Sequence, residues 1–329
     1  RGMKTPSRMR LIACLLAAFV SASALIVSSP RARAADSPVQ GIQISPVTVD
    51  LNAEKANVYI LKITVTNVTA GDLVIRQLVN DFRAKDESGN AEVILDDKEI
   101  DPTYSMKSWV VPAGDMMLRA KESRVVNVEV RIPANAEAGG HYGVVRWSGY
   151  APGQENGKVS IAASVGVLVL ARVNGATTES LLLKDFLLEQ DGKPAWFIEN
   201  GPFTLAERIE NNGNVHVKPT GTVTVKDMFG GTVGTSQLNE PARNILPNSI
   251  RRFSQDLGQK WMFGRYTAQL DATYGYDNKI LTGTMSFWVI PYRLIILIFV
   301  VLGLLVLLFR FLLKRYKARI VKRAMSKRK

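Results

Sequence analysis

Cysteine and histidine are almost absent from this sequence. The single cysteine is Cys14, and the only two histidines are His141 and His216. Structural disulfides and thiolate metal sites are therefore excluded from the region after Cys14, and a histidine-based metal site normally needs two or three such ligands at suitable spacing. We expect a fold that is held together by apolar burial, with no metal centre and no cofactor.

Catalytic signatures are also missing. The sequence contains no H-E-x-x-H pair, no G-x-S-x-G elbow, no Walker loop and no dinucleotide fingerprint. Each histidine is interpreted as a partly buried hydrogen-bonding residue. Carboxylates are plentiful, so a wall hydrolase that uses Asp96 and Glu99 stays open as a third functional class. The cluster around them is more simply a solvated loop, and Asp86–Asn90 is predicted as a hairpin tip, with a calcium loop as the minor alternative. We expect no enzyme and no catalytic residue.

Acidic residues are missing from both ends of the chain. The formal net charge is +13, but the first 34 residues contribute +6 and residues 293–329 contribute +11, so residues 35–292 carry −4. Clustered Lys and Arg normally indicate phosphate binding. Because the charge here flanks apolar segments and the body is mildly acidic, we expect no nucleic-acid partner.

One long uncharged run lies near the C-terminus. Residues Leu294–Phe309 are all apolar or glycine, and together with the preceding "FWVIPY" they reach the roughly twenty residues that cross a bilayer as a helix. We predict a single transmembrane helix at 289–313, followed by a basic cytoplasmic tail at 314–329. Five residues are expected to anchor the helix at the two membrane surfaces: Trp288 and Tyr292 outside, and Arg310, Lys314 and Arg315 inside.

The N-terminal segment has the pattern of a signal peptide. Arg8 and Arg10 precede the apolar stretch Leu11–Val27, and Ala32 and Ala34 occupy the small-residue positions of a cleavage site. We predict a signal peptide at 1–34, cut after Ala34. Lipidation of Cys14 and retention of the segment as an anchor are minor alternatives. The cell membrane is the expected location, with the body outside the cell.

The body of the chain alternates apolar and polar residues with a period of two. "YILKITVTN", "RVVNVEVRI" and "RYTAQLDATY" are clear examples, and turn signals such as "ESGN", "PAGD" and "NNGN" separate such runs at short intervals. This pattern is typical of half-buried strands in sandwiches. We predict an all-β fold of two tandem immunoglobulin-like β-sandwich domains, at 35–174 and 175–288, plus the C-terminal transmembrane helix.

The two predicted sandwiches resemble each other. "TNVTAGDL" and "ENNGNVHV" both end a strand in asparagine and turn through glycine. Tyr142 and Tyr266 both open a strand shortly after a glycine, as the corner tyrosine of an immunoglobulin-like sandwich does, although either one can simply fit a pleated surface. Ser160–Val173 is apolar on both faces but too short for a membrane span, so we predict a central strand that closes the first domain.

This arrangement resembles the WxL-interacting proteins of bacterial surfaces. The resemblance rests on the order of signal peptide, two sandwiches, helix and basic tail, and on soft motifs: "ITVTNVTAGDLVI" and "PANAEAGGHYGVV" in the first domain, and Leu246–Ser249 in the second. Segment Asp81–Asp97 departs from the family pattern. The resemblance implies a first domain that binds peptidoglycan and a second that binds another protein, but it assigns no individual binding residue.

The expected function is therefore that of a membrane-anchored cell-surface binding protein, whose ligand is cell-wall peptidoglycan, a partner surface protein, or both. The alternative is an accessory or chaperone-like component of an envelope export or assembly complex, because exposed strand edges can pair with a client. Exposed aromatic rings stack on sugars and dominate protein contacts. Trp109 and Trp261, near predicted turns, are the candidate ligand-binding residues, whereas Trp147 is expected in the core.

Overall fold

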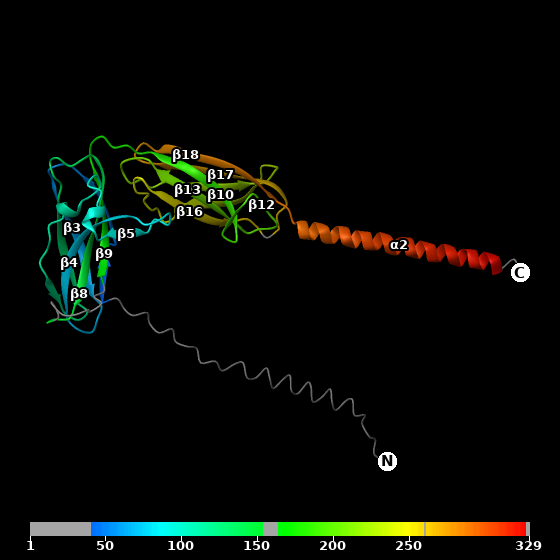
Figure 1. The fold of residues 1–329 in the computed structure, drawn as a ribbon, viewed down its shortest axis with the longest axis horizontal. Helices are drawn as coiled ribbons and strands as arrows, with labels where there is room; N and C mark the ends of the chain where they lie inside the picture. Colours follow the sequence, from blue (N-terminus) through cyan, green and yellow to red (C-terminus); the bar gives the residue numbers. More distant parts are fainter. Residues whose placement is uncertain (1–40, 154–163, 260, 327–329) are drawn as a thin grey trace, which may run out of the picture. The chain divides into compact units, whose positions relative to one another are not determined.

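A computed structural model describes residues 41–153, 164–259 and 261–326 of the chain (Figure 1). These residues form two β-sandwiches and one long C-terminal helix, which confirms the predicted all-β class and the immunoglobulin-like architecture. The predicted signal peptide lies outside the described residues.

The first sandwich contains nine strands in two sheets. The smaller sheet has the order β1-β3-β7, and the larger has the order β2-β9-β8-β4-β5, with β6 also paired to β4. The bounds are β1 Ile42–Ser45, β2 Thr48–Ala53, β3 Val58–Asn67, β4 Leu73–Ala84, β5 Ala91–Ile94, β6 Met116–Leu118, β7 Ser123–Arg131, β8 Gly139–Tyr150 and β9 Ser164–Val173, and two short 3₁₀ helices, η2 Asp97–Glu99 and η3 Lys107–Trp109, lie between β5 and β6.

Strand β9 lies inside the larger sheet, as predicted from its two apolar faces. It pairs antiparallel with β8 and parallel with β2. The core between the sheets is filled by alternating residues of both sheets, with the fully buried Trp147 at its centre, so the prediction for this residue is confirmed. A smaller apolar cluster around Phe82, Tyr142 and Leu170 also receives Leu246 from the second sandwich. The larger sheet therefore buries side chains on both of its faces.

The second sandwich contains the remaining nine strands. One sheet has the order β11-β10-β13-β16 and the other β12-β18-β17-β14-β15. The bounds are β10 Leu181–Gln190, β11 Lys193–Ala195, β12 Phe197–Ile198, β13 Phe203–Asn211, β14 Thr220–Lys226, β15 Thr232–Leu238, β16 Ile250–Leu257, β17 Gly264–Tyr274 and β18 Lys279–Val289. Residues 174–180 connect the two sandwiches without a strand.

The resemblance between the sandwiches holds for their asparagines more than for their tyrosines. Asn67 ends β3 and Asn211 ends β13, and both are fully buried and hold the following turn through their side-chain amides. The hydroxyl of Tyr266 lies 3.2 Å from the backbone nitrogen of Phe263, as in a tyrosine corner. The hydroxyl of Tyr142 instead lies 3.3 Å from Nδ1 of His216 in the second sandwich. Only Tyr266 therefore has the corner geometry.

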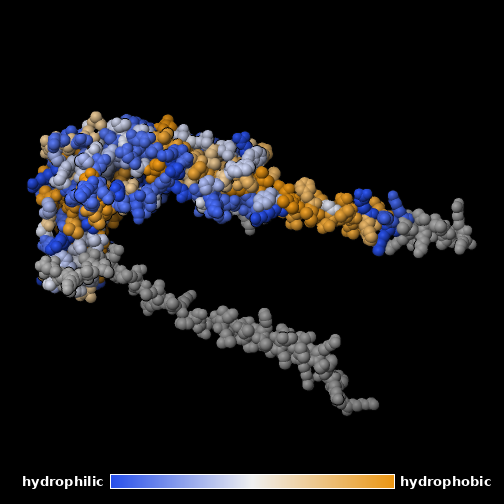
Figure 2. Space-filling view, in the orientation of Figure 1, coloured by the Kyte–Doolittle hydropathy of each residue, from blue (hydrophilic) through white to orange (hydrophobic). Residues whose placement is uncertain are grey.

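Helix α2, Tyr292–Ser326, is the only helix in the described part of the chain that is long and apolar enough to cross a membrane. Its side chains from Leu294 to Leu313 are almost all apolar and, apart from the partly buried Ile295, exposed (Figure 2). The helix extends 13 residues beyond the predicted end of the span at 313. Lys and Arg are good helix formers, and no Gly or Pro interrupts this segment, so the helix continues into the basic region.

Candidate functional site

Polar contacts join the two sandwiches around the tip of the β4–β5 hairpin. Nε of Arg208 on β13 donates to Oε2 of Glu87 at 2.8 Å, and the backbone N–H of Arg252 on β16 donates to the Glu87 carbonyl at 2.7 Å. The Arg208 guanidinium lowers the pKa of the Glu87 carboxyl group. Asp86–Asn90 is thus a hairpin tip, as predicted, and this tip lies against the second sandwich.

Gly89 lies close against the second sandwich. It has a φ of +73°, and a Cβ added there would lie 2.3 Å from Cζ of Arg251. Arg251 is only 8% exposed. Its guanidinium donates to the backbone carbonyl of Asn244 at 2.8 Å and lies over the ring of Phe253. A Cβ at this position would overlap the guanidinium unless the Arg251 side chain shifted.

We expect Gly89→Ala to destabilise the full chain by about 2–3 kcal/mol, from left-handed backbone strain plus steric overlap with Arg251. Gly192 is a matched control, because it also has a φ of +73° but an added Cβ there would meet no atom within 4 Å. Gly192→Ala should cost only about 1 kcal/mol. Urea unfolding of the two variants, with and without Arg251→Ala, measures the difference. If Gly89→Ala still costs more than Gly192→Ala when Arg251 is changed to Ala, overlap with the Arg251 guanidinium is not the cause of the extra destabilisation.

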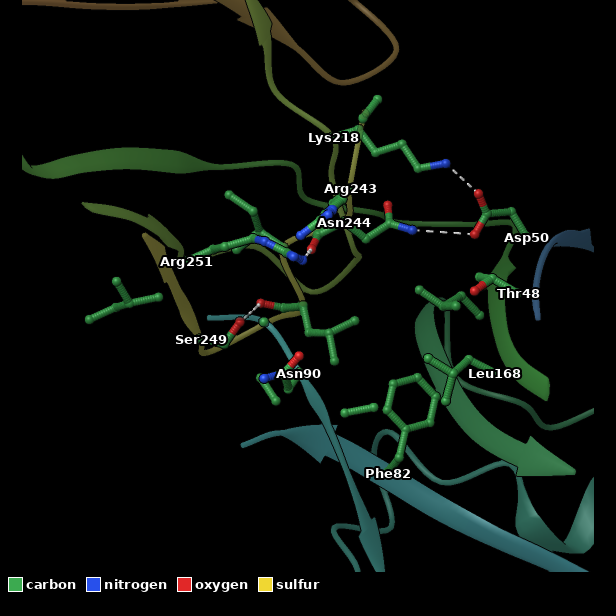
Figure 3. Close-up of a pocket in the computed structure, with 18 residues that line it drawn as sticks. Thr48, Asp50, Phe82, Asn90, Leu168, Lys218, Arg243, Asn244, Ser249 and Arg251 are labelled. Atoms are coloured by element: carbon green, nitrogen blue, oxygen red, sulfur yellow. Dashed lines mark hydrogen bonds and ion pairs between the residues drawn. The ribbon is translucent and has the colours of Figure 1, made fainter. Parts of the chain in front are cut away.

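A cavity of about 420 Å³ lies beside this contact, between the two sandwiches (Figure 3). Arg251, Arg243 and Asn244 of the second sandwich line one side. The first sandwich contributes Thr48, Asp50, Phe82, Leu168 and Asn90. A second cavity of about 300 Å³ shares Phe82, Ala84, Leu246 and Ser249 with the first and is also lined by Tyr104 and Asn248. The two cavities therefore adjoin and form one junction groove.

The charges that line the first cavity are not balanced, because Lys218, Arg243 and Arg251 line it with Asp50 as its one acid. Asp50 is already engaged, since Nζ of Lys218 lies 2.5 Å from its Oδ2 and Nδ2 of Asn244 lies 3.3 Å from its Oδ1. Arg251 and Arg243 pair with no acid among the described residues. Burial lowers the pKa of the Arg251 guanidinium, and the nearby positive charge of Arg243 lowers it further. Two close guanidinium groups without a paired acid favour the binding of an anionic group in the cavity. Carboxylates and phosphates are suitable anions, because they accept paired hydrogen bonds from a guanidinium group.

The groove also offers an acceptor and lies beside two edge strands. Oδ1 of Asn244 is buried and has no hydrogen-bond partner in the described part of the chain, so it can accept from an N–H group. Strand β5 is an edge of the larger first-sandwich sheet and β16 is an edge of a second-sandwich sheet. Ala91 of β5 and Ile250 of β16 line the cavity. An extended polypeptide that carries a carboxylate would meet complementary groups here.

The two tryptophans predicted to bind ligand are in different environments. The expectation that Trp109 lies at the surface is wrong. This residue is buried in η3, where its ring packs against His141 with the ring centroids 4.3 Å apart. The "PAGD" turn lies after this residue, but η3 folds the indole inward. Trp261 is exposed on the loop between β16 and β17. Neither residue lines the groove.

The predicted membrane anchors fall at the two ends of the apolar part of α2. Trp288 is on β18, and Tyr292 is the first residue of the helix. Arg310, Lys314 and Arg315 follow the uncharged stretch and are exposed. This placement is compatible with their predicted role, which stays a prediction.

The acids and histidines considered for catalysis make contacts within the fold. Glu99 lies beside Arg83, with an N–O distance of 3.1 Å, and Asp96 caps η2 by accepting from the backbone of Lys98. His141 has a backbone carbonyl within hydrogen-bond distance of each ring nitrogen. Burial lowers the pKa of His216 to about 4, so it is neutral at pH 7. Among residues 41–153, 164–259 and 261–326, no three metal-ligating side chains gather.

Comparisons with known proteins give structural similarities only. No known family and no curated protein matches the sequence. The class 5 fimbriae chaperone CfaA is 13% identical, with 76% of this chain and 99% of that chain covered and a TM-score of 0.35. The E. coli chaperone DraB is 13% identical, with 75% and 96% covered and a TM-score of 0.33. A PapD-like domain of human CEP192 is 11% identical, with 46% and 96% covered and a TM-score of 0.30.

Proposed function

We propose that this chain is a membrane-anchored, non-enzymatic binding protein that holds an extended, carboxylate-bearing segment of a partner protein in its junction groove. One observation carries the proposal: Arg251 is buried on the groove wall beside Arg243, and neither guanidinium forms an ion pair with an acid in the described part of the chain. A buried charge without a counter-charge is costly, and a bound carboxylate offsets that cost.

Helix α2 supplies the anchor in this proposal. Its first turns are uncharged after Arg293, and the basic residues that follow Leu313 would remain on the cytoplasmic side of the membrane. The sandwiches then lie outside the cytoplasm, which is consistent with the predicted signal peptide. This orientation gives the groove access to exported proteins.

A protein ligand fits the groove better than cell-wall glycan does. Sugars bind on exposed aromatic rings, but of the three rings that line the groove, Phe82 and Tyr142 are buried and Tyr104 is only partly exposed. The edge strands β5 and β16, apart from the Arg252 N–H that the Glu87 carbonyl already occupies, instead favour addition of an extended chain. This favours an assembly or chaperone-like role over glycan adhesion, with a partner surface protein as the client.

Site-specific photocrosslinking in the native membrane tests this function. Ala242 is exposed and lines the first cavity. A photoreactive residue there should give an adduct with an exported protein, and Arg243→Glu with Arg251→Met should abolish the adduct. Ala70, an exposed residue in the turn after β3, is the control position and should not give that adduct. An adduct with glycan, or one that survives both arginine substitutions, would sink the proposal.

A further inference from the structure

Large exposed aromatic side chains gather at the end of the second sandwich from which α2 leaves. All three exposed tryptophans of the described chain are in this set, while Trp109 and Trp147 are buried in the first sandwich. We call the set the aromatic rim: Trp196, Phe197, Phe229, Trp261, Phe263 and Trp288.

Strand register brings these residues to the same end. Phe197 of β12 pairs with Trp288 of β18, and Gly264, directly after the Trp261–Phe263 loop, pairs with Val289. Phe229 is in the β14–β15 turn, which reaches the same end because a Cβ added to Gly264 would lie 1.8 Å from Cε of Met228. Four segments that are separated in sequence therefore contribute to one surface.

The loops that carry the rim are ordered by contacts on their inner side. Oδ1 of Asp227 accepts from the backbone nitrogens of Phe229 and Gly231, at 2.9 and 2.8 Å, and this leaves the Phe229 ring 90% exposed. Met262 is buried between the exposed Trp261 and Phe263. The rings thus point outward although their backbone is held in place, so the rim is a built apolar surface rather than a frayed loop.

A groove of about 520 Å³ makes the rim continuous with the start of α2. It is lined by Trp196, Phe197, Trp288, Ile290 and Tyr292, the last of which is the first residue of the helix. Only Ile290 and Pro291 separate β18 from α2, and two residues span at most about 7 Å. If α2 crosses a bilayer, the rim is within reach of the headgroup layer.

The chemistry of the rim suits that layer. Tryptophan and other amphipathic rings are enriched at the membrane–water interface. Glu199, the nearest acid in sequence to Phe197, is 3.4 Å from Arg293 at the helix start. Exposed apolar patches of this kind on a soluble domain normally mark an interaction site. Here the patch is directly continuous with an apolar helix.

We propose that the aromatic rim is a lipid-contacting surface, which inserts into the headgroup layer and fixes the second sandwich to the membrane from which α2 emerges. This inference rests on the proposed membrane anchoring. It adds a second attachment, so the sandwich cannot swing freely about the two-residue connection. The junction groove is then held at a set height, because β16 runs from Ile250 at the groove toward the rim over about 25 Å.

Quenching of tryptophan fluorescence by brominated lipids tests this surface in the full chain reconstituted into phosphatidylcholine nanodiscs. Variants that retain Trp109, Trp147 and one rim tryptophan, with the other two changed to Phe, report on one position each. Trp288, beside the helix, reports anchoring by α2. We expect Trp196 and Trp261 to lose emission to an extent comparable with Trp288, and the buried pair to lose little.

The matched control places a tryptophan at the other end of the same hairpin. Tyr276, in the β17–β18 turn, is 88% exposed, and the 11 residues of β17 separate it from the rim by roughly 35 Å. Tyr276→Trp, with Trp196, Trp261 and Trp288 changed to Phe, should add unquenched emission. Quenching of Trp288 alone would overturn the rim proposal and leave the anchor intact. Absence of all quenching would overturn both. A third outcome is that Trp196 and Trp261 are shielded from solvent but are not quenched by brominated lipid, and that crosslinking yields dimers. This outcome would mean that a second copy of the chain covers the rim.

Discussion

Glu207→Gln is expected to stabilise the full chain by about 3 kcal/mol at pH 8 and to leave its stability nearly unchanged at pH 4.5. Glu207 is on β13, on the face that packs into the core of the second sandwich between Leu205 and Ile209. It is fully buried, and neither carboxylate oxygen has a hydrogen-bond partner among the described residues. A glutamine has nearly the shape of the protonated side chain but cannot ionise.

Burial raises the pKa of Glu207 to about 7, and the smaller opposing effects of the neighbouring Gln255 and of the Arg252 charge do not offset it. The folded chain therefore holds this proton more tightly than the unfolded chain, whose glutamate has a pKa of about 4.5. The contribution of the protonated Glu207 to the free energy of unfolding is fully present below pH 4.5 and is lost as the pH rises to about 7. A difference of about 2.5 pH units corresponds to roughly 3 kcal/mol.

Urea unfolding at four pH values between 4.5 and 8, followed by circular dichroism in detergent, measures this effect. Glu210→Gln is the control, because Glu210 is on the same strand but is only partly buried and lies beside Lys184, 3.4 Å away. That variant should keep the pH dependence of the original chain. If the free energy of unfolding depends on pH equally in Glu207→Gln and in the original chain, Glu207 is not the group that causes the pH dependence.

The strands were largely predictable because alternation is a local signal. The run "YILKITVTN" falls entirely within β3, and "RYTAQLDATY" falls within β17. The central position of β9 followed from its two apolar faces. The same local signal is silent on where a single polar residue points when it breaks the pattern. Glu207 follows Leu205 at a spacing of two, so its side chain points into the core, but no neighbouring residue indicates that a carboxylate is buried there.

The junction groove was not predicted because its parts are distant in sequence. Gly89 and Arg251 are brought together only by the packing of two sandwiches. The alternation of "SIRRF" does carry one usable signal, since Arg251 and Phe253 fall on one face of β16 and Arg252 on the other. The aromatic rim has the same limitation. Its rings come from four segments between Trp196 and Trp288, and register alone unites them.

Asn211→Ala and Asn67→Ala are each expected to destabilise the chain by about 3 kcal/mol, yet only the first should impair partner binding. Nδ2 of Asn211 donates to the carbonyls of Val215 and Ile245 at 2.8 Å, and its Oδ1 accepts from the nitrogen of Gly213 at 2.9 Å. Removal of the asparagine side chain leaves these buried backbone groups without hydrogen-bond partners.

Asn67 makes the equivalent contacts in the first sandwich. Its Nδ2 donates to the carbonyls of Gly71 and Arg119 at 2.8 and 2.9 Å, and its Oδ1 accepts from the nitrogen of Thr69 at 2.9 Å. Both asparagines are fully buried. The stability cost of removing either side chain should therefore be similar, and Asn52→Ala, at an exposed position on β2, should stay within about 0.5 kcal/mol of the original chain.

The two positions differ in what they hold. Asn211 binds Ile245, and its backbone exchanges hydrogen bonds with Asn248 and Ser249, so it fixes the segment that carries Arg243 and lines the groove. Crosslinking from Ala242 should therefore fall in Asn211→Ala and persist in Asn67→Ala at matched folded fractions. Equal loss in both variants would mean that adduct formation follows global stability. Loss in Asn211→Ala alone would show that the groove segment must be held in place for the partner to bind.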